Sequence, residues 1–263
     1  MQNSIMNILF IGDIVGRPGR EAIKTLLPKL IDREKIYLVV ANAENAAGGS
    51  GINPKCAEEL FSYGIDVLTS GDHIFKRQEV LSIIDNPYLL RPANLPPQAL
   101  GKGYCILEKK GIKIGVLNLQ GRVFMQPIDC PFRIAQEIVE KIRKETNIII
   151  VDIHAEATSE KIALSFFLDG EVSLVCGTHT HVQTADEKIL PLGCAYITDV
   201  GMTGPCGSVI GRRKEQVIER FLTGMPTRFE VALEDVQLQG IICEIDQNSG
   251  KAKAIKRVKE CLS

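Results

Sequence analysis

Short apolar runs rich in β-branched residues alternate along this chain with segments whose apolar residues recur at helical spacing. Most of the runs are continuous and do not alternate with polar residues, which is typical of strands that are covered on both faces. We predict strands at residues 7–12, 36–41, 65–70, 112–118, 147–152, 172–177, 195–198 and 240–245. The last of these is expected at a sheet edge or in a second sheet.

The patterns between the strands predict helices at residues 20–33, 55–63, 132–144, 158–168 and 214–222. The second helix has the clearest limits, because Asn53 supplies an N-cap, Pro54 the first helical position and Gly64 the end. The alternation of strands and helices predicts a layered α/β fold. Both halves of the 263 residues show the same alternation, so we expect a single domain over residues 1–263.

The composition excludes several classes of function. The chain carries 31 Lys and Arg against 32 Asp and Glu, so it lacks the basic character of a protein that binds duplex nucleic acid. The apolar run at residues 5–11 is too short for a membrane span and does not read as a signal peptide, so we expect a cytoplasmic protein with no membrane partner. The eight cysteines are scattered without a C-x-x-C pair, and we expect buried, reduced thiols.

The histidines are the most informative residues. The chain has only four, and each follows a predicted strand: His73, His154, His179 and His181. A lone histidine after a strand is usually an ordinary loop residue, and His181 could be a surface residue beside a functional His179. Because neutral imidazole is the commonest metal ligand, four such placements together favour a metal site.

Carboxylate and amide side chains occupy matching places. Asp13, Glu44 with Asn45, and Asp72 follow the first three predicted strands. Taken singly, Asp13 and Asp72 are typical of helix caps or turns, and Asn45 could simply shape its loop. In open α/β sheets, however, ligands bind outside the carboxyl ends of the strands, so we expect these loops to converge. The donors are too many for one tetrahedral zinc ion and suit two bridged metal ions.

Two glycine-rich segments lack the spacing of known nucleotide-binding loops. Residues 12–19 do not fit the dinucleotide fingerprint, and residues 48–51 lack the Lys-Ser/Thr of a P-loop. This argues against a nucleotide-binding oxidoreductase. The glycines favour a close approach of backbone to a metal cluster or a substrate phosphate. Arg212 and Arg213 are candidate phosphate contacts, although a short basic cluster is typical of solvated surface.

At this point the motifs resemble those of a known family, the YmdB-type metallophosphoesterases of bacteria. The motifs are Gly-Asp-Ile-Val-Gly-Arg-Pro-Gly, Ala-Glu-Asn-Ala-Ala-Gly-Gly, Ser-Gly-Asp-His-Ile, His-Ala-Glu-Ala-Thr-Ser-Glu-Lys, Gly-Thr-His-Thr-His-Val-Gln-Thr-Ala-Asp and Asp-Val-Gly-Met-Thr-Gly-Pro. The resemblance runs from residue 8 to about residue 213 and more loosely to the end. It implies an α/β, calcineurin-like metallophosphoesterase fold of two mixed β-sheets flanked by α-helices, with two divalent or trivalent iron or manganese ions at the strand ends.

The resemblance also implies a reaction, the hydrolysis of phosphodiesters such as 2′,3′-cyclic nucleotides, and residues that perform it. The residues implied for one metal ion are Asp13, Glu44 and His181, with Asn45 beside them. Those implied for the other are Glu44 as a bridge, Asp72, His154 and His179. His73 would be the general acid for a leaving alkoxide expelled by a metal-bridging hydroxide.

Two positions depart from the family pattern. The family usually has Asn where this chain has Asp72, and it commonly has Asp where this chain has Gly207. Asp72 adds a negative charge facing an anionic substrate, and two unit charges ~4 Å apart repel by about 4 kcal/mol at an effective dielectric near 20. The alternative is therefore a catalytically weakened, metal-binding regulatory protein of the same fold. The partners expected are a small phosphodiester and no stable duplex nucleic acid, and homo-oligomer formation is left open.

Overall fold

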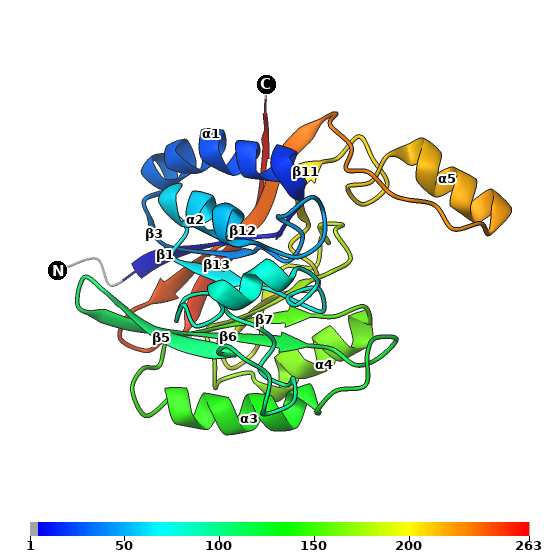
Figure 1. Cartoon of the computed structure of the whole chain (residues 1–263). Coiled ribbons are helices and arrows are strands. Elements are labelled where there is room, and N and C mark those ends of the chain that lie inside the picture. The colour runs from blue at the N-terminus through cyan, green and yellow to red at the C-terminus, as the bar shows by residue number, and fades with distance from the viewer. Residues whose placement is uncertain (1–4, 263) are drawn as a thin grey trace.

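The computed structural model describes residues 5–262 and contains two mixed β-sheets that pack face to face, with helices on their outer faces (Figure 1). This confirms the expected α/β architecture. Helices α1 (Gly16–Glu34) and α2 (Pro54–Ser62) cover one sheet, and α3 (Pro131–Ile142) and α4 (Thr158–Phe167) cover the other. Helix α5 (Lys214–Thr223) stands away from these layers (Figure 1). A short 3-10 helix, η1, spans Gln78–Ser82.

The first sheet has seven strands in the order β2-β11-β12-β1-β3-β4, with β13 also paired to β12. Their bounds are β1 Ile5–Ile11, β2 Asp13–Ile14, β3 Ile36–Asn42, β4 Val67–Thr69, β11 Met202–Pro205, β12 Val236–Asp246 and β13 Ala252–Cys261. Strands β1, β3 and β4 are parallel, so their carboxyl ends meet at one edge. The loops that follow these strands carry the carboxylate and amide candidates.

The expectation for the last predicted strand is wrong. Strand β12 lies inside the first sheet, where it runs antiparallel to β1 over Gly240–Asp246 and antiparallel to β13 over Gln237–Ile245. The physical reason is burial on both faces, because Leu238 and Ile242 belong to the core under α1 while Ile241 and Cys243 belong to the core between the sheets. A strand that is apolar on both faces has no place at a solvated edge.

The second sheet has six strands in the order β5-β6-β7-β8-β10-β9. Their bounds are β5 Tyr104–Lys109, β6 Ile112–Gln120, β7 Ile149–His154, β8 Leu174–Thr178, β9 Lys188–Ile189 and β10 Ala195–Ile197. Strands β6, β7, β8 and β10 are parallel, and β7 and β8 lead into the remaining histidine candidates. The carboxyl ends of both parallel sets therefore lie along one seam between the sheets.

The core has three parts that hold this seam in place. Phe10 and Val40 of the first sheet pack with Val116 and Ile150 of the second between the two sheets. A second cluster lies under α1 and α2, and a third under α3 and α4. Helix α2 begins as the sequence predicts, since the Asn53 side chain accepts a hydrogen bond from the Cys56 backbone N–H at 2.9 Å.

The eight cysteines are free thiols, and five of them are buried. The expected burial is wrong for Cys261, which is exposed, and incomplete for Cys130 and Cys206. Cys261 ends β13, a strand with one solvated face, which explains its exposure. Among the helices within residues 5–262, none combines the length and the apolar character that crossing a bilayer requires.

Candidate metal centre

The first sheet supplies the oxygen donors. Asp13 begins β2 directly after β1, and Glu44 and Asn45 follow β3. Asp72 and His73 follow β4. Glu44 is nearly fully buried, and its backbone N–H donates to the Asn42 side-chain oxygen at 3.0 Å, which fixes the turn after the strand.

The second sheet supplies the remaining imidazoles. His154 is the last residue of β7, and His179 and His181 follow β8. Because the two parallel sets end at the same seam, the structure brings all the candidates from the sequence into one connected group. Apart from His73, the imidazole nitrogens thus approach the oxygen donors from the opposite sheet.

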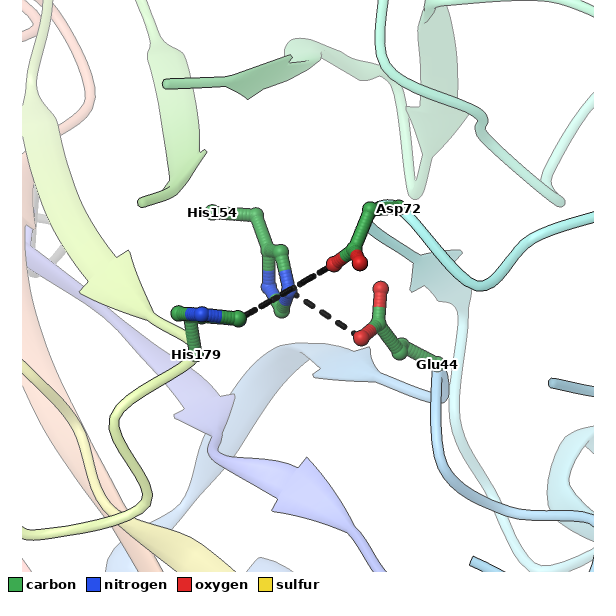
Figure 2. Close-up of side chains that lie close together, drawn as sticks. All are labelled: Glu44, Asp72, His154 and His179. Carbon is green, nitrogen blue, oxygen red and sulfur yellow. Dashed lines mark hydrogen bonds and ion pairs between the residues drawn. The ribbon is translucent and has the colours of Figure 1, made fainter. Parts of the chain in front are cut away.

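Glu44, Asp72, His154 and His179 form the tightest cluster, and Figure 2 shows their side chains pointing toward one another. Each offers one ligand atom, and these atoms lie within 4.8 Å of one another. His154 Nε2 lies 3.2 Å from Glu44 Oε1 and 3.5 Å from Asp72 Oδ1. His179 Nδ1 lies 3.0 Å from the same Nε2.

Asp13, Asn45 and His181 form a second group beside this cluster. His181 Nε2 lies 3.7 Å from Asp13 Oδ1 and 3.2 Å from Asn45 Nδ2. Asp13 Oδ1 is also 3.9 Å from His154 Nδ1, and Asp13 Oδ2 accepts the His179 backbone N–H at 3.1 Å. The two groups are therefore continuous.

The residues fit bound metal ions. Asp13 Oδ1 and Asp72 Oδ1 are buried atoms without a hydrogen-bond partner among the described residues, and such atoms are rare unless an ion or water satisfies them. The ring nitrogens His154 Nε2 and His179 Nδ1 face each other at 3.0 Å. If both rings are neutral, only one of these nitrogens can donate a proton to the other, and two unprotonated nitrogens at this distance would both be free to bind a metal ion. Mixed carboxylate and imidazole donors are a ligand set that transition metal ions accept.

A polar network beneath His154 sets the direction of its ring. Nδ1 lies 2.8 Å from the Thr178 hydroxyl, which donates to Asp152 Oδ1 at 2.8 Å. Asn42 and Thr69 donate to the other Asp152 oxygen at 3.0 and 2.6 Å. With Nδ1 engaged below, Nε2 is directed into the cluster, which is the usual arrangement for a metal-binding histidine.

The His179-Thr180-His181 turn is held by a buried ion pair. His179 and His181 have φ values of 100° and 64°, a backbone region that non-glycine residues rarely occupy. The Thr180 backbone N–H and hydroxyl donate to Asp199 Oδ2 at 3.1 and 2.7 Å. Lys161 Nζ from α4 donates to the same oxygen at 2.9 Å, and both charged side chains are fully buried.

Burial and mutual charge govern the acid–base properties of the cluster. Burial raises the pKa of Asp13 to about 7. Burial acts in the same direction on Glu44, but the charges and hydrogen bonds of His154 and His73 outweigh it and lower the pKa of that carboxyl. Burial alone would lower the pKa of His154, but Glu44 and Asp72 hold it well above its usual value.

His73 lies at the rim of the cluster, with about a third of its side chain exposed. Its Nδ1 is 3.1 Å from Glu44 Oε1 and 3.2 Å from Asn45 Oδ1, and its Nε2 is 3.7 Å from Asp72 Oδ2. The hydrogen bond to Glu44 raises the pKa of His73, so the ring tends to keep its proton.

A cavity of about 300 Å³ opens over these residues. Its lining residues come from several loops and are Val15, Glu44, Asn45, Gly49, His73, Glu156, His179, Thr180, His181, Ile210 and Arg212. Gly207 is not among them and lies beside Glu234 and Asp235. An aspartate at position 207 would stand next to those two acids and away from the cavity.

Sequence reasoning missed several supporting residues. Asp152 could have been found, because it precedes His154 by two residues on one strand and so faces the same side. Glu156, whose carboxylate lies 3.2 Å from His179 Nε2, is near His154 in the same motif. No local pattern in the sequence predicts the ion pair between Lys161 and Asp199, because the two residues lie on different elements.

Comparison with known proteins identifies relatives over nearly the whole chain. A sequence profile of the family described as "YmdB-like protein" matches residues 9–258. The 2′,3′-cyclic-nucleotide 2′-phosphodiesterase of Bacillus subtilis is 47% identical over 254 residues, covering 96% of both chains. A structure of a Mycoplasma pneumoniae phosphatase matches with a TM-score of 0.93 at 38% identity, covering 99% of this chain and 95% of that one. A hypothetical protein from Thermus thermophilus matches with a TM-score of 0.92 at 39% identity, covering 97% and 99%.

Proposed function

Because this chain belongs to the YmdB-like family, we propose that it is a hydrolase of phosphodiester bonds and that its substrates are 2′,3′-cyclic nucleotides. The observation that carries the proposal is the convergence of Glu44, Asp72, His154 and His179 within 4.8 Å at a seam between two sheets. The two-sheet fold agrees with both solved relatives, and the phosphoesterase class agrees with the one that is called a phosphatase.

We assign the donors to two metal ions, iron or manganese. Asp13, Glu44 and His181 would hold one, with Asn45 beside them, and Glu44, Asp72, His154 and His179 the other. When bound, such ions supply Lewis acidity that polarises phosphoryl oxygens and makes a water molecule acidic. Asp72 keeps an oxygen 3.5 Å from His154 Nε2, so a carboxylate at this position remains placed as a ligand.

His73 is the residue that we assign to proton donation. A leaving alkoxide needs a proton, and His73 is partly exposed at the mouth of the cavity with its Nδ1 bound to Glu44. The hydrogen bond to Glu44 raises the pKa of His73, a shift that favours the protonated ring which a general acid needs. We assign the donated proton to the other ring nitrogen, Nε2, which lies 3.7 Å from Asp72 Oδ2.

The test is metal analysis combined with hydrolysis of 2′,3′-cyclic AMP in added Mn²⁺. His73→Ala should keep its metal and lose roughly 10²- to 10⁴-fold in rate, the usual contribution of general acid–base catalysis. His154→Ala and Glu44→Ala should lose both metal and activity. Lys141→Ala, an exposed change on α3, is the control and should leave both unchanged.

The regulatory alternative is decided in the same assay. A wild-type protein that binds metal without turnover, together with an Asp72→Asn variant that gains turnover, would replace the enzymatic proposal. Equal loss of metal in the variants of His73, His154 and Glu44 would refute the separate role of His73.

A further inference from the structure

One cation lines the cavity over the metal centre. Arg212 is the only lysine or arginine among the lining residues, all of which fall in the described part of the chain. Its Nη2 donates to the backbone carbonyl oxygen of Gly49, and this is the one hydrogen bond that its side chain makes within residues 5–262. Burial lowers its pKa, and no carboxylate contributes to that shift. A half-buried guanidinium without an acidic partner therefore faces the same space as His73 and His181.

The other arginines nearby are used differently. Arg77 packs against the same glycine-rich loop and donates to two of its carbonyl oxygens, those of Ser50 at 3.1 Å and Ala47 at 2.8 Å. Arg213 is exposed and pairs with Glu230 at 3.0 Å. Neither lines the cavity. Arg212 thus differs from both in having uncommitted donors at the site.

The glycine-rich loop is shaped to admit this guanidinium. Gly49 has a φ of +84°, and a Cβ placed on it would lie 2.5 Å from Arg212 Nη1. A side chain here would displace the guanidinium as well as strain the backbone. Glycine at position 49 therefore leaves the space that the Arg212 guanidinium occupies.

We propose that Arg212 binds a non-bridging phosphate oxygen of the substrate, and that the apolar wall of Val15 and Ile210 receives the organic group attached to that phosphate. The proposal rests on the phosphoesterase function argued above. A planar guanidinium with most of its N–H donors free is suited to phosphate, which it can bind through paired hydrogen bonds.

The first experiment measures affinity for phosphate. In Mn²⁺-loaded protein, Arg212→Gln should weaken binding of inorganic phosphate, measured by calorimetry, by about 10- to 100-fold, the range expected for a lost hydrogen bond to a charged group. The KM for 2′,3′-cyclic AMP should rise similarly, with kcat changed much less. The phosphate affinity of Arg212→Lys should lie between those of wild type and Arg212→Gln, because lysine keeps the positive charge but lacks the paired N–H donors of the guanidinium. Arg213→Gln is the matched control and should bind phosphate as wild type does.

A second variant separates binding from packing. Gly49→Ala displaces the guanidinium without removing its charge, so this variant should bind phosphate more weakly than wild type. In the double variant, adding Arg212→Gln to Gly49→Ala should cause little further loss of phosphate affinity. A purely structural role predicts instead that Arg212→Lys and Arg212→Gln lower the melting temperature or the metal content equally and leave phosphate affinity unchanged. Either that pattern or unchanged affinity in Arg212→Gln would overturn the proposal.

The outcomes also distinguish this inference from the proposed function. If wild type binds phosphate but turns over no cyclic nucleotide, the substrate assignment fails, and a loss of phosphate affinity in Arg212→Gln still supports Arg212. If wild type is active and Arg212→Gln retains its KM and its phosphate affinity, the enzymatic proposal stands and Arg212 is excluded from binding.

Discussion

Lys161→Met is the substitution for which the structure gives the clearest quantitative expectation. Lys161 Nζ and Asp199 Oδ2 lie 2.9 Å apart, and both side chains are fully buried. Removing the cation leaves a buried carboxylate whose remaining partners include Thr180 and the Gly201 backbone N–H. Breaking a buried ion pair by removing one partner costs about 3–5 kcal/mol.

For a chain of this size, 1 kcal/mol corresponds to roughly 2–4 °C in the melting temperature, so the loss should be roughly 6–20 °C. The measurement is thermal melting followed by circular dichroism in chelator, which removes any contribution of bound metal. The control is Lys141→Met, which breaks an exposed pair with Glu137 at 2.7 Å. Such surface pairs contribute about 0.3–0.5 kcal/mol, so the control should melt within roughly 2 °C of wild type.

The same variant tests whether the ion pair supports the His179-Thr180-His181 turn. If Asp199 fixes Thr180, Lys161→Met should also weaken metal binding, whereas Lys141→Met should not. A melting temperature within roughly 2 °C of wild type, or an unaltered metal affinity in a clearly destabilised variant, would show that the reasoning about this pair is wrong.

Two further predictions concern metal binding. Metal loading at pH 7 should release protons, because in the metal-free protein burial raises the pKa of Asp13 to about 7 and neighbouring carboxylates raise that of His154. Calorimetry in buffers of different ionisation enthalpy measures the number of protons released on metal binding. This number should decrease as the pH rises above the pKa of Asp13, and a number that stays constant with pH would contradict the prediction. Thr178→Val removes the hydroxyl 2.8 Å from His154 Nδ1 and should weaken metal affinity by about 10- to 100-fold. Competition with a chelator measures this loss, and an affinity equal to that of wild type would exclude the hydroxyl as an orienting group.

Much of the fold could be predicted because its central strands are continuous apolar runs. All eight predicted strands and all five predicted helices are present, with ends shifted by a few residues. Of the two longest missed strands, β13 carries charged residues on both faces, and β5 has a short apolar run that ends at Glu108 and Lys109. Both are edge strands, and their existence depends on neighbours that the local sequence does not specify.

The candidate site followed from one rule, that parallel strands present their carboxyl ends at a common edge. That rule placed Asp13, Glu44, Asp72 and the histidines together without any knowledge of distances. It could not reveal which neighbouring side chains hydrogen-bond to these residues and orient them. The partners of Asp199 come from a helix and a turn whose approach depends on how the second sheet packs, so no periodicity in the sequence encodes it.

The division of donors between the sheets has a consequence for assembly. The second sheet contributes His154, His179 and His181, whereas the first contributes the carboxylates and Asn45. In the assignment proposed above, each ion takes ligands from both sheets, so tight binding of an ion would require that the two sheets have packed together. A bound ion would then connect the sheets, and its binding energy would add to the stability of the folded chain.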